Sequence, residues 1–142
     1  MQEGGSRVIT GHRYHNPAAA IEWLCGVLGF QTRAVFEDEN GIIVHAELTM
    51  GGGMIMLGSG KDDEFSRSFR SPDDLSGIET RVAYIVVPDA DKVHDRAVSA
   101  GARIIMPLHD TQNGAREFAA KDLEGHTWVI GTYNPWDDRE EL

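Results

Sequence analysis

The feature that most constrains the fold is that the second half of the chain repeats the plan of the first half. A strand-like segment begins at Arg81, 74 residues after a similar segment that begins at Arg7. Two further pairs of segments match at a spacing of 73, and these are 114–118 with 41–45 and 127–130 with 54–57. A nearly constant spacing over several elements indicates a duplicated module.

Each half reads as a strand, a helix and three more strands. Apolar residues recur at helical spacing after Pro17, and Gly29 ends this first helix. Asp89 or Asp91 begins the second helix, and Gly101 ends it. The pattern predicts an α+β fold of two βαβββ modules. The predicted divisions are a first module (1–58), a connection (59–79), a second module (80–133) and an acidic tail (134–142).

The connection lacks a clear period and is rich in Gly, Ser, Asp and Arg. Phe65 and Phe69 lie four residues apart, as on one face of a short helix. Two interpretations stay open: a lid that folds over a pocket, since long loops are often functional, or a solvated linker that two aromatic side chains attach to the surface.

Composition excludes several classes of partner. The net charge is −10 and the basic residues do not cluster, which disfavours nucleic acid. The sequence has no run of about 18 apolar residues for a bilayer and no signal peptide at its start. Its one cysteine, Cys25, cannot form an internal disulfide, so we expect a cytoplasmic protein with Cys25 as a buried, inert thiol.

Three stretches of the chain, 20–30, 87–102 and 116–128, match the pattern of a known family, and the last contains an Asp-x-x-Gly turn at 122–125. These stretches resemble the vicinal oxygen chelate superfamily, which includes glyoxalase I, bleomycin-resistance proteins, fosfomycin-resistance enzymes and extradiol dioxygenases. The chain departs from the family's pattern at Leu123, which replaces a common proline of the turn. The resemblance covers nearly all of residues 7–133. It implies that the two modules form an open, cup-shaped mixed sheet with helices on the outside and face each other around a cavity. It also implies metal ligands on the first and last strand of each module.

The positions that the resemblance assigns to metal ligands hold apolar residues. Register places Ile9 and Met56 there in the first module, and Ala83 and Val129 in the second. A divalent ion needs imidazole, carboxylate or thiolate ligands, and a slip of one residue does not restore them. We therefore expect no metal cofactor.

Strand alternation then predicts the lining of the cup. We expect a mostly apolar cavity with a few polar groups, formed by Gly11, Arg13, His45, Glu47, Met54, Met56, Ile85, Arg116, Phe118, Thr127, Val129 and Gly131. The residues expected to pack beneath the helices are Ile55, Leu57, Tyr84, Trp128 and Ile130. The alternative is that the lining residues fill a closed core.

Catalytic residues stay unassigned, with three candidates. His45 and Glu47 share one strand face and could act as acid and base or as metal ligands. Because the sequence shows no third or fourth ligand for them, a polar, partly exposed sheet face is the favoured interpretation. Arg116 could hold an anionic group of a ligand, or it could form a salt bridge. His126 is expected to brace the turn before the last strand, His12 and His15 to lie near the pocket rim, and His94 and His109 on the surface.

The resemblance and the apolar positions together favour a protein that binds a small organic molecule without metal, as the bleomycin-resistance branch does. One alternative is a metal-dependent lyase, isomerase or dioxygenase with displaced ligands such as His45, Glu47 and His12. Another is a metal-free enzyme with Glu47 as base and Arg116 as anion holder. Whether the chain is an enzyme stays open, and analogy favours a homodimer.

Overall fold

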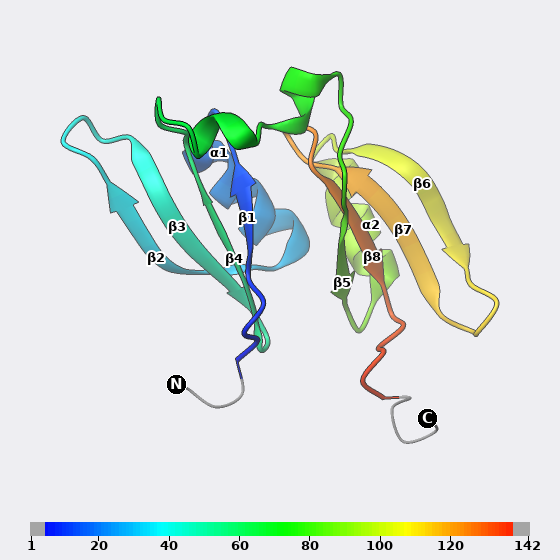
Figure 1. Ribbon diagram of the computed structural model, residues 1–142. Coiled ribbons are helices and arrows are strands. Elements are labelled where there is room, and N and C mark those ends of the chain that lie inside the picture. The colour runs from blue at the N-terminus through cyan, green and yellow to red at the C-terminus, as the bar shows by residue number, and fades with distance from the viewer. Residues whose placement is uncertain (1–4, 138–142) are drawn as a thin grey trace.

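The computed structural model describes residues 5–137, and its chain runs through two modules of the same topology (Figure 1). The elements of the first module are β1 (Thr10–Arg13), α1 (Pro17–Trp23), the π-helical η1 (Leu24–Leu28), β2 (Gln31–Glu37), β3 (Ile43–Met50) and β4 (Gly53–Gly58). The elements of the second module are β5 (Ala83–Val86), α2 (Ala90–Ser99), β6 (Arg103–Asp110), β7 (Arg116–Lys121) and β8 (Thr127–Gly131). Two short 3₁₀ turns, η2 (Ser66–Ser68) and η3 (Pro72–Leu75), lie in the connection.

The ends of the helices are set by local chemistry. The Asn16 side chain accepts a hydrogen bond from the Ala19 N–H, and Pro17 occupies the first helical position. In α2 the Asp89 side chain accepts from the Lys92 N–H. Gly29 ends the first helical segment with a φ of 93°, a left-handed conformation that glycine adopts at little cost. These boundaries confirm the ones predicted.

The strands form two separate four-stranded sheets with matching orders, β1-β4-β3-β2 and β5-β8-β7-β6. β1 and β5 pair in parallel with β4 and β8, and every other pairing is antiparallel. Figure 1 shows the sheets side by side, with both helices behind them and the connection across one end. The α+β class and the two βαβββ modules are confirmed, and the sheet stays open.

Both modules share one hydrophobic core on the helix side of the sheets. Its largest fully buried side chains include Trp128, Tyr14 and Phe118. The Phe30 and Trp128 rings, from different modules, lie 5.8 Å apart edge to face. Across the helices, Arg96 Nε donates to the Val27 carbonyl at 3.0 Å. We call the opposite face of each sheet, turned away from the helices, its free face.

The structural repeat differs from the predicted repeat by one residue in two strands. Gly11 pairs with Met56 in the first module, and Tyr84 pairs with Val129 in the second. Because Met56 and Val129 occupy the same place in the last strand of each module, Gly11 and Tyr84 are equivalent. The spacing from Gly11 to Tyr84 is 73, whereas the matched arginines suggested 74 for this strand.

The second one-residue difference between the predicted and the structural repeat comes from a β-bulge in β3. In the first module the pair Phe36–His45 is followed by Glu37–Ile43, so Val44 is an extra residue in β3. In the second module the pairs His109–Glu117 and Asp110–Arg116 follow without an extra residue in β7. His45 therefore corresponds to Glu117 rather than to Phe118, and a slip of one residue exchanges the two faces of a strand.

No helix within residues 5–137 is both long enough and apolar enough to cross a bilayer. The last residues of the predicted acidic tail, 138–142, lie outside the described part of the chain.

Candidate functional site

The free face of the first sheet presents sulfur and small side chains at its centre. Ile55 and Leu57 are buried under the helices, so Met54 and Met56 of β4 face the other way and are half-buried. Gly11 of β1 is the register partner of Met56, and Glu47 of β3 lies opposite Met56 on the other side. These residues share one face of the sheet, as strand alternation predicts, and their role as the lining of a ligand site stays a prediction.

A cluster of polar side chains lies beside Met54 and Met56. His45 Nε2 is 3.0 Å from Glu47 Oε2, and Arg33 Nη1 donates to Glu47 Oε1 at 2.9 Å. The hydrogen bond from His45, with a further contribution from Arg33, lowers the pKa of Glu47. The Phe36 ring lies 5.7 Å from the His45 ring and remains exposed. Glu47 is thus an ionised carboxylate held from two sides.

The free face of the second sheet carries Tyr84 on β5 and Val129 on β8, which are register partners. Tyr84 is 38% exposed, and its hydroxyl donates to the Tyr133 carbonyl at 2.8 Å. Gly131 leaves room for the phenol, because a Cβ there would lie 2.6 Å from Tyr84 Oη. Burial and the nearby Glu117 raise the pKa of Tyr84, so its hydroxyl stays a donor at neutral pH.

A second histidine–carboxylate pair lies on this face. His109 Nε2 of β6 is 3.3 Å from Glu117 Oε2 of β7, and Glu117 occupies the place that His45 has in the first module. The prediction treated His109 as an isolated surface residue. No feature of the apolar pattern marks the pair, because the extra Val44 in β3 changes which residue of β7 corresponds to His45.

Three residues predicted to line the cup in the second module lie on the helix side instead. Phe118 and Ile85 are buried in the shared core at 0% and 6% exposure. Arg116 bonds Asp91 of α2 through Nε at 3.0 Å and Asp110 through Nη1 at 3.2 Å, and the bond to Asp91 raises its pKa. The salt-bridge interpretation of Arg116 is therefore confirmed.

The one-residue shift in β5 also reversed the predicted faces of Tyr84 and Ala83. Tyr84 was expected beneath the helices and lies on the free face, while Ala83, assigned to a metal-ligand position, packs against the core. The remaining predicted members, Thr127, Val129 and Gly131, do alternate with the buried Trp128 and Ile130.

His12 does not join His45 and Glu47. It lies on the core side of β1, where its ring stacks on Trp128 at 5.1 Å and meets the His126 ring edge to face at 5.1 Å. Burial, followed by the charges of His126 and Arg81, lowers the pKa of His12 to about 4. His12 is thus a neutral core residue rather than one at a pocket rim.

His126 braces the junction of the modules as well as its own turn. Its Nε2 lies 2.8 Å from the Arg13 carbonyl and its Nδ1 lies 3.6 Å from Glu79 Oε2. The exposed His15 is 2.7 Å from Asp74 of the connection through Nε2.

The connection packs against the end of the first free face. Arg13 Nη1 donates to the Ser66 carbonyl at 3.1 Å, and the Arg13 guanidinium lies 4.3 Å over the Phe69 ring. Phe65, which is 72% exposed, meets Phe69 edge to face at 5.1 Å. The aromatic pair therefore lies beside the site, flanking η2 rather than extending one helix.

The donor atoms on the free faces do not fit the family's divalent metal. Once the register is corrected, the positions in question are Ile9, Met56, Val82 and Val129, whose side chains carry no imidazole, carboxylate or thiolate. Among residues 5–137, no three His, Cys, Asp or Glu side chains form a group that could hold a metal ion.

Known proteins are similar to this chain in both sequence and architecture. A family model for the Glyoxalase/Bleomycin resistance protein/Dioxygenase superfamily matches residues 10–130. An uncharacterised protein of Mycobacterium tuberculosis is 25% identical over 138 residues, which cover 92% of this chain and 81% of that protein.

Solved structures of other proteins share this architecture. TioX from Micromonospora sp. ML1 is 30% identical with a TM-score of 0.68, over 92% of this chain and 100% of TioX. The fosfomycin resistance protein FosX from Mesorhizobium loti is 16% identical with a TM-score of 0.59, over 98% and 99%. From the family match over most of its length and from the shared two-module architecture, this chain belongs to the glyoxalase/bleomycin resistance protein/dioxygenase superfamily.

Proposed function

We propose that the protein binds a small, largely apolar organic molecule against its free faces, without the family's metal site. The observation that carries the proposal is the chemistry of the former ligand positions, Ile9, Met56, Val82 and Val129. Aliphatic and thioether side chains attract apolar surface, and methionine adapts to ligands of different shape. Small-molecule sites are typically apolar with a few polar groups, as these faces are.

The polar groups at the edges give such a ligand its orientation. The His45–Glu47 and His109–Glu117 pairs offer hydrogen-bonding groups on opposite sides of the apolar centre. At one end, Phe65 and Phe69 offer exposed ring surface beside Arg13. A flat ligand with hydrogen-bonding substituents suits this arrangement.

Binding is favoured over the two enzymatic alternatives by the positions of their residues. The metal-dependent alternative took His12 as an example of a third ligand beside His45 and Glu47, and His12 lies in the core. The metal-free alternative needed Arg116 near Glu47, but Arg116 lies on the helix side with Asp91. The lowered pKa of Glu47 also makes it a weak general base at neutral pH.

We also propose a cytoplasmic homodimer in which a second copy packs against the exposed apolar side chains of β5, beside the ligand site. Val82 and Val86 at β5 are 57% and 40% exposed and flank Tyr84. Such a strip of exposed apolar side chains is typical of an interaction surface. Light scattering should give twice the chain mass, and Val82→Asp should reduce it to the monomer mass. A monomer at all concentrations would contradict this assembly.

The ligand site is tested with Nile red, a neutral fluorescent dye, followed by displacement with a small-molecule library. Met56→Lys should weaken dye binding at least about tenfold, because it places a charge at the centre of the site. Val98→Lys is the matched control, since Val98 is an exposed apolar residue on α2 and its variant should bind as wild type.

Metal analysis of protein purified without a tag or chelator completes the test. The proposal expects far less than one metal ion per chain and unchanged dye binding after chelator treatment. One metal per chain, with binding that depends on it, would contradict the proposal and direct attention to His45 and Glu47.

A further inference from the structure

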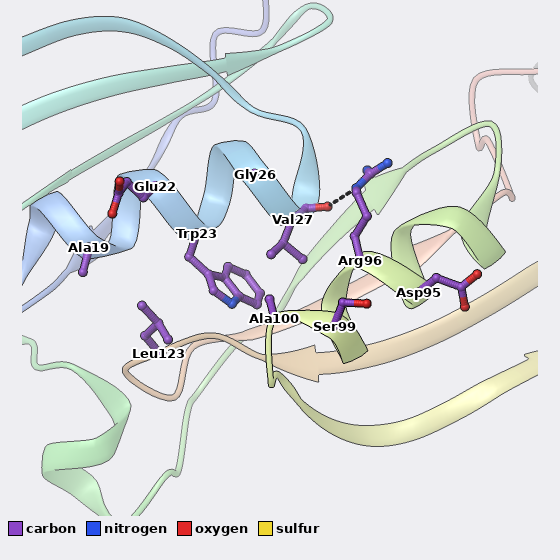
Figure 2. A pocket seen from close by; sticks show the side chains of 10 residues that line it. All are labelled: Ala19, Glu22, Trp23, Gly26, Val27, Asp95, Arg96, Ser99, Ala100 and Leu123. Atoms are coloured by element: carbon purple, nitrogen blue, oxygen red, sulfur yellow. Dashed lines mark hydrogen bonds between the residues drawn. The ribbon is translucent and has the colours of Figure 1, made fainter.

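A groove of about 690 Å³ lies between the two helical segments, on the side of the sheets opposite the free faces. Trp23 and Val27 form one wall, Ala100 lies on the other, and Leu123 of the turn before β8 lies at one end (Figure 2). The volume is within the range of about 300–1,000 Å³ that is usual for small-molecule pockets. The family's metal positions, which lie on the free faces, contribute nothing to it.

The floor of the groove contains an unsatisfied hydrogen-bond donor. Trp23 is 6% exposed, and its indole N–H is the one buried side-chain polar atom in residues 5–137 without a hydrogen-bond partner. Figure 2 shows the indole between Leu123 and Ala100, with its nitrogen on the ring edge directed away from α1. The Nε1–H of Trp128 is paired with Asp122 at 3.0 Å, as buried indoles normally are.

The helix that carries Trp23 has an unusual conformation beside the groove. Residues Leu24–Leu28 form a π-helix, a rare conformation that is often found at functional sites. The Val27 carbonyl lies in its last turn, where carbonyls lose their helical partners, and it accepts from Arg96 Nε of α2. This bond links the two walls of the groove.

We propose that the groove is a second binding site, for a neutral and mostly apolar molecule that carries a carbonyl or ether oxygen. The indole N–H only donates, so the ligand supplies the acceptor. Of the charged residues that line the groove, Glu22 and Asp95 outnumber Arg96, whose Nε is bonded to the Val27 carbonyl. Together with the net charge of −10, they disfavour anions. Because the groove and the free faces lie on opposite sides of the sheets, this proposal does not depend on the proposed function.

The probe is acetophenone, with ethylbenzene as a comparison molecule of similar shape that lacks the oxygen. The indole N–H signals of Trp23, Trp128 and Trp136 are assigned by Trp→Phe variants in nitrogen-15 NMR spectra of the full chain. Acetophenone should move the Trp23 signal downfield in a saturable way, and ethylbenzene should bind about five- to tenfold more weakly because it forms no hydrogen bond.

Two variants isolate the site. Trp23→Phe keeps an aromatic ring but removes the donor, so the two probes should then bind equally, as followed by the amide signals of Ser99 and Ala100. Gly26→Leu fills the groove, since a Cβ at Gly26 meets nothing within 4 Å, and it should abolish binding of acetophenone. Ala18→Leu adds the same bulk at an exposed position of α1 outside the groove and should leave binding unchanged.

Three results would overturn the proposal. The first is a Trp23 signal that does not respond up to the solubility limit of acetophenone. The second is Gly26→Leu protein that binds as wild type, with shifts confined to the free faces around His45 and Glu117. The third is a Trp23 signal that moves with protein concentration and a molecular mass that falls in Gly26→Leu, which would assign the groove to contact between copies of the chain.

Discussion

His12 shows how burial changes the chemistry of one residue. Its ring lies between Trp128 and His126 with Thr10 Oγ1 at 3.1 Å, and burial lowers its pKa from 6.5 to about 4. The unfolded chain therefore binds the proton more tightly than the folded chain. The stability that neutral His12 contributes is present above pH 6.5 and is lost as the pH falls toward 4.

We expect the free energy of unfolding to fall by about 2 kcal/mol between pH 7 and pH 5 through His12 alone. Urea unfolding at both pH values measures the change, and His12→Asn should remove most of it. His15→Asn is the control, since His15 is exposed. A pH dependence that persists in His12→Asn would assign the titration to another group.

At the scale of the elements, the start of α1 is held by the other module. Glu124 of the turn before β8 accepts from the His15 N–H at 2.6 Å and from the Asn16 N–H at 2.8 Å. A carboxylate at this end of a helix also interacts favourably with the helix dipole. The turn of the second module thus completes the N-terminus of a helix in the first.

Glu124→Gln removes the charge and one of the two acceptor oxygens, so it should lower the free energy of unfolding by about 1–2 kcal/mol. Glu39→Gln, in the exposed β2–β3 hairpin, is the control and should change it by less than about 0.5 kcal/mol. Thermal unfolding at several salt concentrations provides the measurement. Equal effects of the two variants would show that the contact of Glu124 with α1 contributes no stability.

The elements also show how far sequence reasoning can reach. Helix ends were predictable because Pro17, Gly29, Asp89 and Gly101 act locally through proline geometry, capping and left-handed backbone. The strand faces of the first module followed from alternation. In the second module the faces of β8 were also predicted correctly, and those of β5 were displaced because the matched arginines indicated a spacing of 74 instead of 73. The faces of β7 were displaced by one residue, because the extra Val44 of the β3 bulge leaves no mark in the apolar pattern. Arg116, Phe118 and the His109–Glu117 pair were misplaced for this reason.

At the scale of the whole molecule, the duplication could be predicted from the sequence, but the contacts that join the two modules could not. Contacts between distant residues leave no periodic pattern in a sequence. Asp122 is central to the contacts that join the modules. Its Oδ2 accepts from Tyr14 Oη of the first module at 2.5 Å and from Trp128 Nε1 at 3.0 Å. Burial and Asp122 raise the pKa of Tyr14, so this hydroxyl remains a donor in neutral and mildly alkaline solution. Tyr14 of the first module and Trp128 of the second are both buried around this carboxylate, at 0% and 1% exposure.

We therefore expect the chain to unfold as one unit. Asp122→Ala leaves two buried donors without their acceptor and should cost about 3–5 kcal/mol, whereas Tyr14→Phe removes one hydrogen bond and should cost about 1 kcal/mol. Hydrogen exchange separates a shared core from two independent modules. If the core is shared, Tyr14→Phe lowers the protection of slow amides in β3 and β7 by the same factor, because both exchange through global unfolding. Loss of protection confined to β3, or two transitions in urea, would mean that each module is stable alone and that the buried junction only joins them.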